Sequence, residues 1–264
     1  MRPYLRAYST HLQNVLQRRA SLIMDRVGGL ALMVSLYYFW SAVIGDKESF
    51  LGYTRAQMLS YVLLMNILRS FCLSGRGWEL VSEISSGRIT SYLIRPVSYQ
   101  LYSLSLDLAQ KTVHLASACI EIAFLAAILG APLYIPSRPE TWAAFAAAVI
   151  LSSLLFFSLE FLVSSFAFWT AESAGPLFCF ELFLQFAAGA FFPLDVLPEG
   201  LRSALSATPF PSMVFLPINI FLERLPAGDV ARALAGQAAW LAAAALASRL
   251  VWNAGVKGYA AEGG

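Results

Sequence analysis

Charged residues are scarce in this chain: Asp, Glu, Lys and Arg together make up 13% of its 264 residues. Soluble domains contain roughly 25% charged and 45–50% apolar residues. Here 58% of the residues are hydrophobic and the mean hydropathy is +0.65. The formal net charge of +2 does not provide the basic patch that a nucleic-acid-binding protein shows. The composition therefore excludes a water-facing domain and a nucleic-acid partner, and it predicts an integral membrane protein.

Cysteine and histidine are too few for several kinds of site. Cys72, Cys119 and Cys179 lie in apolar stretches without a CxxC spacing, so we expect buried free thiols and neither a disulfide framework nor a zinc site. With only His11 and His114, a histidine-rich metal site is excluded. The hydrolase motifs H-E-x-x-H and G-x-S-x-G are absent, so we expect no metal and no catalytic residue.

The phosphate-binding motif G-x-x-x-x-G-K-[ST] is also missing, and the dipeptide Gly-Lys does not occur. Without this phosphate cradle the chain cannot hydrolyse ATP as a P-loop ATPase. No cleavable signal peptide is visible, because the apolar run after the basic first 26 residues is too long for one. We therefore expect the first span to remain in the membrane as an anchor.

Long apolar stretches are what the sequence does have. A membrane-spanning helix needs roughly 20 mostly apolar residues, and six stretches meet or approach this length. The second is the weakest, since it contains Asn66 and Arg69. The six expected spans are Val27–Gly45, Ala56–Ser74, Thr112–Gly130, Trp142–Phe168, Ala174–Phe192 and Leu234–Trp252.

The distribution of Lys and Arg predicts the orientation of these spans. Eleven lie in the N-terminal segment, in the loop between the second and third spans and near the C-terminus. Six lie in the remaining loops, which also hold seven acidic residues. Because cytoplasmic loops carry the excess of positive charge, the first group is expected in the cytoplasm. An even number of spans then places both termini there.

Residues 1–26 are expected to form an amphipathic helix on the cytoplasmic leaflet. Leu5, Tyr8, Leu12 and Val15 recur at helical spacing, whereas the arginines occupy other faces. The alternative is an ordinary solvated helix.

The loop 75–99 is the largest cytoplasmic segment expected. Residues 78–85 suit a short helix that Gly87 would end as its C′ residue. Residues 89–94 suit a second turn, stopped by Pro96. We expect this hairpin to contact another molecule, the alternative being a solvated connector.

The segment 193–232 is apolar but is interrupted by six prolines. Irregular backbone at membrane depth survives only where protein or a water-filled cavity satisfies it. We expect short re-entrant helices in the outer leaflet. The alternative is a seventh span, which would place the C-terminus outside.

Several polar residues lie within the expected spans, where charges are costly and mark function or helix packing. Asp107, Lys111, His114 and Glu121 share one helix face, which we call the polar seam; it must face protein or water, and its first two members can pair. Glu160 and Glu181 are also deep, and Gln185 lies one turn from Glu181. For Glu121, Glu160 and Glu181 three roles are open: interhelical hydrogen bonding, substrate passage and proton coupling. Arg69 could instead extend to the interface.

The cytoplasmic loop resembles a known family. The stretch Glu83-Ile-Ser-Ser-Gly-Arg-Ile-Thr-Ser-Tyr-Leu-Ile-Arg-Pro-Val-Ser98 is similar to the loop after the second span of bacterial ABC-2 type permeases. Three other stretches resemble the same family: Gly189-Ala-Phe-Phe-Pro-Leu-Asp-Val-Leu-Pro198, Thr208-Pro-Phe-Pro211 and the terminal Tyr259…Gly264. The likeness in layout extends over essentially the whole chain.

This resemblance implies an all-α integral membrane fold with an interfacial helix, a cytoplasmic coupling helix, re-entrant outer helices and one domain over residues 1–264. It also implies a permease subunit, an exporter in the bacterial inner membrane, paired with an identical or homologous permease and with two copies of an ATP-binding cassette ATPase. ATP and Mg would bind the ATPase and not this chain. The expected contacts with the ATPase are Trp78, Glu79, Glu83, Gly87, Arg88 and Arg95.

Two other classes of function remain open: a membrane-embedded enzyme using Glu121, Glu160 or Glu181, and a scaffold that does not transport. The residues do not specify the substrate.

Overall fold

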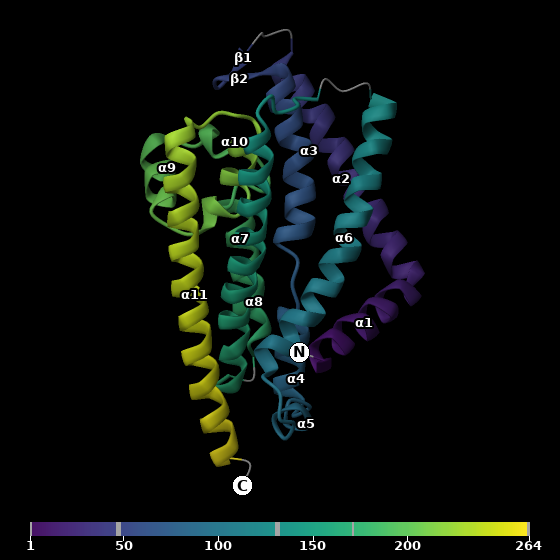
Figure 1. The fold of residues 1–264 in the computed structure, drawn as a ribbon, viewed down its shortest axis with the longest axis vertical. Helices are drawn as coiled ribbons and strands as arrows, with labels where there is room; N and C mark the ends of the chain where they lie inside the picture. Colours follow the sequence, from purple (N-terminus) through teal and green to yellow (C-terminus); the bar gives the residue numbers. More distant parts are fainter. Residues whose placement is uncertain (1, 46–48, 130–132, 171, 263–264) are drawn as a thin grey trace.

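The structure is a computed structural model that describes residues 2–45, 49–129, 133–170 and 172–262, and it is almost entirely helical. Five long helices run roughly along the long axis of the molecule, with the shorter α8 among them (Figure 1). These helices are α2 (Arg19–Ile44), α3 (Arg55–Cys72), α6 (Tyr99–Leu129), α7 (Pro139–Ser164), α8 (Ala174–Ala187) and α11 (Ala227–Glu262). This confirms the expected all-α architecture.

Within the described residues, four helical stretches are long and apolar enough to cross a membrane, or five if one bent pair counts as a span. The four are Leu22–Ile44, Arg55–Ser85, Pro139–Phe168 and Gly228–Tyr259. The expected third span lies within α6, which already begins at Tyr99. Its side chains after Glu121, and its expected end at Gly130, fall outside the described residues.

The expected fifth span is shorter than predicted. Helix α8 ends at Ala187, where we expected helix through Phe192. Gly189 then adopts φ +78°, a left-handed conformation that glycine tolerates and that turns the chain out of the helix. With 14 residues, α8 measures about 21 Å, less than the roughly 30 Å of a bilayer core.

The expected interfacial helix 1–26 is also divided. Helix α1 (Arg2–Gln17) ends at Arg18, whose ψ of 52° leaves the helical region, and α2 starts at Arg19. The break directs α1 across α6, where the Tyr8 hydroxyl and Thr112 Oγ1 are 2.9 Å apart. No residue of α1 is fully buried, and Leu5 remains 67% exposed. These exposed apolar side chains match an amphipathic helix.

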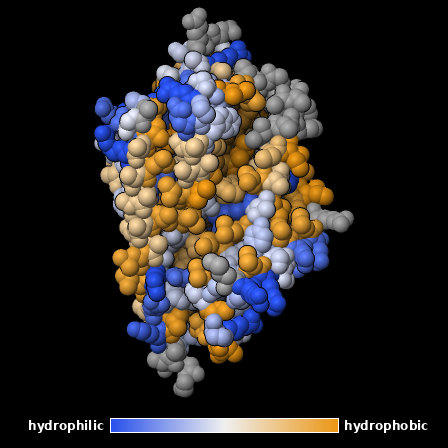
Figure 2. All heavy atoms as spheres, in the orientation of Figure 1, coloured by the Kyte–Doolittle hydropathy of each residue, from blue (hydrophilic) through white to orange (hydrophobic). Residues whose placement is uncertain are grey.

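The two ends of the molecule hold different elements. At one end lie α1, the C-terminal end of α11 and the short helices α4 (Gly77–Ser85) and α5 (Thr90–Leu93). At the other lie β1 (Ser49–Phe50), β2 (Tyr53–Thr54), α9 (Glu199–Ser206) and α10 (Phe215–Phe221) (Figure 1). Figure 2 shows an apolar belt between more hydrophilic ends, interrupted near its middle by a hydrophilic stretch.

Helix α3 forms the centre of the larger core. Most of its side chains are buried, among them Met58, Tyr61 and Met65. Its start is fixed by a capping box, in which Thr54 and Gln57 exchange hydrogen bonds with each other's backbone N–H. Cys72 at its end is buried, as expected. Cys119 and Cys179 are instead exposed, because they lie on outward faces of α6 and α8.

The segment 193–232 consists of short helices, as expected: η2 (Leu194–Val196), α9, η3 (Phe210–Ser212) and α10. Asp195 ties this segment to the hairpin β1–β2. Its carboxylate accepts a 2.6 Å hydrogen bond from the Tyr53 hydroxyl and forms an ion pair with Arg224 at 3.0 Å. The Arg224 guanidinium also lies 3.5 Å from the centre of the Tyr53 ring. One carboxylate therefore holds three separate pieces of chain together.

Candidate functional site

A polar pocket of about 270 Å³ lies among α2, α3, α6 and α8. Three residues singled out in the sequence, Arg69, Glu121 and Gln185, come together there from three different helices. The remaining lining residues are Arg26, Gly28, Gly29, Met33, Asn66, Ser70 and Leu73. We call this cavity the polar pocket.

Arg26 of α2 organises one side of the pocket. One terminal nitrogen lies 2.7 Å from His114 Nδ1, and the other donates to Ser70 Oγ at 3.2 Å and to Glu121 Oε1 at 3.5 Å. The polar seam of α6 therefore faces protein at His114 and Glu121, as predicted. The sequence analysis missed Arg26 because it counted this residue with the cytoplasmic charges. Its position directly before the apolar run could have indicated that Arg26 lies at the end of a span.

Arg69 of α3 forms the other side. Its guanidinium donates to Gln185 Oε1 of α8 at 3.3 Å, and the residue is partly buried. This contact directs the side chain toward α8. Arg69 therefore lines the pocket.

The first half of the polar seam has a different environment. Lys111 Nζ and Asp107 Oδ2 are 2.8 Å apart, and their side chains are only 1% and 2% exposed. Lys111 also lies 5.7 Å from the centre of the Phe156 ring of α7. This confirms the predicted i,i+4 pair and places it in the contact between α6 and α7, outside the polar pocket.

Glu160 of α7 is likewise buried and lies outside the pocket. It accepts a hydrogen bond from the backbone N–H of Gly77 at the start of α4. A Cβ atom on Gly77 would come within 2.8 Å of Glu160 Cγ and of Ser164 Oγ, and one on Gly75 would come even closer to the carboxylate. Glycine is thus required where the α3–α4 connection crosses α7.

The predicted contact loop forms a helical hairpin, α4–α5. Leu80, Ile84 and Ile89 are buried against Phe161 and Trp252, so the hairpin is packed on the bundle. Gly87 has φ +73°, and its N–H donates to the Ile84 carbonyl, which confirms it as the C′ residue of α4.

The outer face of this hairpin carries most of the polar candidates. Glu79, Arg88 and Arg95 are exposed, and Trp78 is 42% exposed. Trp78 Nε1 donates to Glu181 Oε2 at 3.1 Å, which links α4 to α8. Glu181 therefore contacts the hairpin and does not line the polar pocket.

Glu83 lies on the buried face of α4, although the resemblance implied a contact with a partner. It accepts a hydrogen bond from the Tyr99 hydroxyl and lies 3.8 Å from Arg76. Its side chain is 12% exposed. Helical periodicity explains the difference, because Glu83 shares the face of Leu80 and Ile84.

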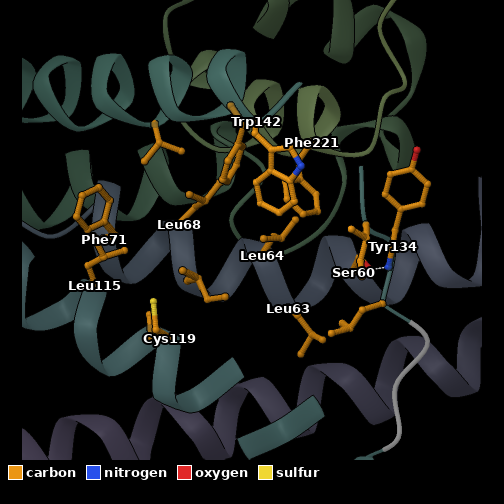
Figure 3. A pocket seen from close by; sticks show the side chains of 16 residues that line it. Ser60, Leu63, Leu64, Leu68, Phe71, Leu115, Cys119, Tyr134, Trp142 and Phe221 are labelled. Atoms are coloured by element: carbon orange, nitrogen blue, oxygen red, sulfur yellow. Dashed lines mark hydrogen bonds between the residues drawn. The ribbon is translucent and has the colours of Figure 1, made fainter. Parts of the chain in front are cut away.

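A second cavity, of about 430 Å³, lies among α3, α6 and α7 and is almost wholly apolar. Figure 3 shows Leu115 and Cys119 at one side of it and Trp142 beside Phe221 at another. The one hydrogen bond drawn there joins the Tyr134 backbone N–H to Ser60 Oγ at 2.7 Å. Among the described residues that line this cavity, none carries a charged side chain.

Within the described residues, no three His, Cys, Asp or Glu side chains are grouped so that they could hold a metal ion. The three deep glutamates also have separate partners: Arg26 for Glu121, Gly77 for Glu160 and Trp78 for Glu181. The geometry thus provides a polar pocket and a packed hairpin, and it gives these three glutamates separate partners among the described residues.

The comparison with known families agrees with this architecture. A search among curated proteins finds no match to the chain. The model of a family described as ABC-2 family transporter protein matches residues 30–263, which include every membrane-span candidate except the first turns of α2. Permeases of the ABC-2 family work with an ATPase subunit in general. Because the match extends over most of its length, the chain belongs to the ABC-2 family of transporter proteins and is a multi-pass membrane permease of the ABC type.

Proposed function

We propose that this chain is the permease of an ABC exporter in the bacterial inner membrane, and that the α4–α5 hairpin receives the motion of the ATPase. Two copies of the ATPase, carrying ATP and Mg, would work with two permeases, the second identical or homologous. The observation that carries this proposal is the two-faced hairpin. Its buried face packs on α7 and α11, and its exposed face offers Trp78, Glu79 and Arg88.

The packing supports a mechanical role for the hairpin. In a solvated connector, Leu80 and Ile84 would not be buried in the same core as Trp252. Glu160 and Glu181 add polar contacts from α7 and α8 to the start of α4. A push on the exposed face is therefore transmitted to three helices. ATP can drive this movement only through its different affinity for two states of the assembly.

We propose six crossings with both termini in the cytoplasm. The fifth crossing would be α8, whose 14 residues are shorter than the bilayer core, together with the residues that adjoin it. The termini-bearing helices and the α4–α5 hairpin share one end of the molecule, which supports an even number of crossings (Figure 1). Helices α9 and α10 have eight and seven residues and belong to a pair bent by 80°. Each measures about 10–12 Å, too short for a crossing of roughly 30 Å. We therefore favour a re-entrant segment over a seventh span.

The test begins with a pull-down of the full chain from native membranes, which should recover a P-loop ATPase. The ATPase activity of the purified complex is then measured in proteoliposomes with the double variant Glu79→Gln/Arg88→Gln. We expect severalfold lower permease-stimulated activity and an unchanged melting temperature, because both side chains are exposed.

The matched control is Arg232→Gln, an exposed arginine at the opposite end. It should leave the ATPase activity unchanged. If no ATPase is recovered, or if both variants retain full stimulation, the coupling role is wrong. In that case, activity of the chain alone on a lipid or peptide would indicate an enzyme, and inactivity would indicate a scaffold.

A further inference from the structure

We propose that the polar pocket binds an anionic oxygen group, a phosphate or carboxylate, at the head of the transported molecule. This inference rests on the proposed transport function and adds a substrate class to it. The site consists of Arg26, Arg69, Asn66, Ser70 and Gln185, with Glu121 as a competing carboxylate.

The charges of the described side chains in the pocket favour an anion. Two guanidinium groups line it, and Glu121 provides one carboxylate. Arg26 reaches that carboxylate through a single 3.5 Å contact. Arg69 forms no ion pair with any described residue, and it donates a hydrogen bond to the neutral amide of Gln185. Since a charged side chain within a membrane is costly unless it is paired or hydrated, Arg69 leaves a place for an external anion.

The donors that remain suit an oxyanion. A guanidinium has five N–H donors in a planar fork that fits phosphate and carboxylate groups. Arg69 uses one of its terminal nitrogens for Gln185, so its other donors are available to a ligand. The side-chain amide of Gln185 and the hydroxyl of Ser70 line the same space.

The shape of the pocket indicates a headgroup. Its volume of about 270 Å³ is just below the roughly 300–1,000 Å³ of pockets that enclose whole drug-sized ligands. A Cβ atom added at Gly28 or Gly29 would meet nothing within 4 Å, so the pocket is open along α2. An anionic head can enter on this side while an apolar remainder stays outside, among the exposed apolar side chains of the belt.

The experiment uses the purified full-length chain in nanodiscs of phosphatidylcholine, without the ATPase. Binding is measured by tryptophan fluorescence for three probes: a short-chain phosphatidic acid, a short-chain phosphatidylcholine and inorganic phosphate. We expect phosphatidic acid to bind at least about tenfold more tightly than phosphatidylcholine, because its terminal phosphate carries more negative charge and more free oxygens, whereas the choline cation of phosphatidylcholine neutralises and shields its single phosphate charge.

Three variants test the site. Arg69→Gln should abolish the preference for the anion, and Arg69→Lys should restore part of it, because it keeps the charge and loses the fork. Glu121→Gln should tighten anion binding, because it removes the competing carboxylate. Arg249→Gln removes the same charge from an exposed position on α11 and should have no effect. Melting temperatures without ligand report whether each variant is folded.

Tight binding of phosphatidic acid alone supports an amphiphile headgroup, and equal binding of inorganic phosphate supports a free oxyanion at the same site. Equal affinity for the two lipids would overturn the proposal. So would a loss of affinity in Arg249→Gln as large as that in Arg69→Gln. Because no ATPase is present, failure here leaves the coupling proposal intact, and failure to recover an ATPase leaves this measurement valid.

Discussion

The carboxylate of Glu160 on α7 occupies the space that a side chain on Gly77 would need. A Cβ atom there would lie 2.8 Å from Glu160 Cγ, a distance that no packed structure tolerates without movement. The connection between α3 and α4 therefore contacts α7 at this point. The contact requires glycine on the α3–α4 connection and is made by a buried carboxylate on α7.

Gly77→Ala should lower the free energy of unfolding by about 1–3 kcal/mol, as overpacking does. Glu160→Ala removes one of the two side chains that the new methyl group meets, the other being Ser164. In a double-mutant cycle measured by thermal melting, the combined variant should lose less than the sum of the two single losses. Strict additivity would show that the contact has no energetic consequence. Gly200→Ala, where a Cβ would meet nothing within 4 Å, is the control.

The Asp107–Lys111 pair gives a second prediction. Removing one partner by Lys111→Met leaves an uncompensated buried charge, so we expect a loss of about 3–5 kcal/mol in unfolding free energy. The double variant Asp107→Leu/Lys111→Met should be more stable than the single variant, since neither member of the pair then carries a charge. Asp229–Arg232 is an exposed pair on α11, and Asp229→Asn should leave the melting temperature unchanged. A loss in the double variant equal to that in the single one would contradict this account.

The environment of Glu223 predicts a pH dependence at the end of the molecule that holds β1 and β2. Hydrogen bonds donated by Tyr134, Thr141, Ser137 and the Arg138 N–H hold its pKa at about 2, below the ordinary value of 4.5. A carboxyl whose folded pKa is lowered contributes stability above its unfolded pKa and loses that contribution as the pH falls through the folded pKa. The melting temperature of the native chain should therefore exceed that of Glu223→Gln at pH 6. This difference should shrink progressively from pH 4.5 to pH 2; a difference that stays constant over this range would exclude the mechanism.

The number of crossings can be measured by labelling single cysteines in a background where Cys72, Cys119 and Cys179 are replaced by alanine. An impermeant maleimide should react with Ser203→Cys in intact bacterial cells. It should react with Ser82→Cys and Lys257→Cys only after the cells are permeabilised, because both positions are expected in the cytoplasm. Reaction of Lys257→Cys in intact cells would show that segment 193–232 crosses the membrane.

The sequence by itself determined the class of the protein, the sites of the apolar helices and the turn at Gly87. These features depend on local composition and on backbone conformation. Hydropathy along a helix shows that it can enter a membrane, and a glycine after a short helix can adopt the left-handed conformation that ends it. The i,i+4 pair of Asp107 and Lys111 could be predicted for the same reason.

Only the tertiary structure decided which polar residues meet. Arg26 reaches His114 and Glu121 because α2 packs beside α6, and no periodicity within one helix can reveal a partner on another. The packing of α4 on the bundle gives Glu83, which shares a helix face with Leu80 and Ile84, the Tyr99 hydroxyl as its partner, and it places Glu160 against two glycines. The early end of α8 has a similar origin, since the Tyr61 hydroxyl of α3 donates to the Gly189 carbonyl where the helix stops. Contacts between distant segments, which a linear pattern does not contain, thus determined the pocket.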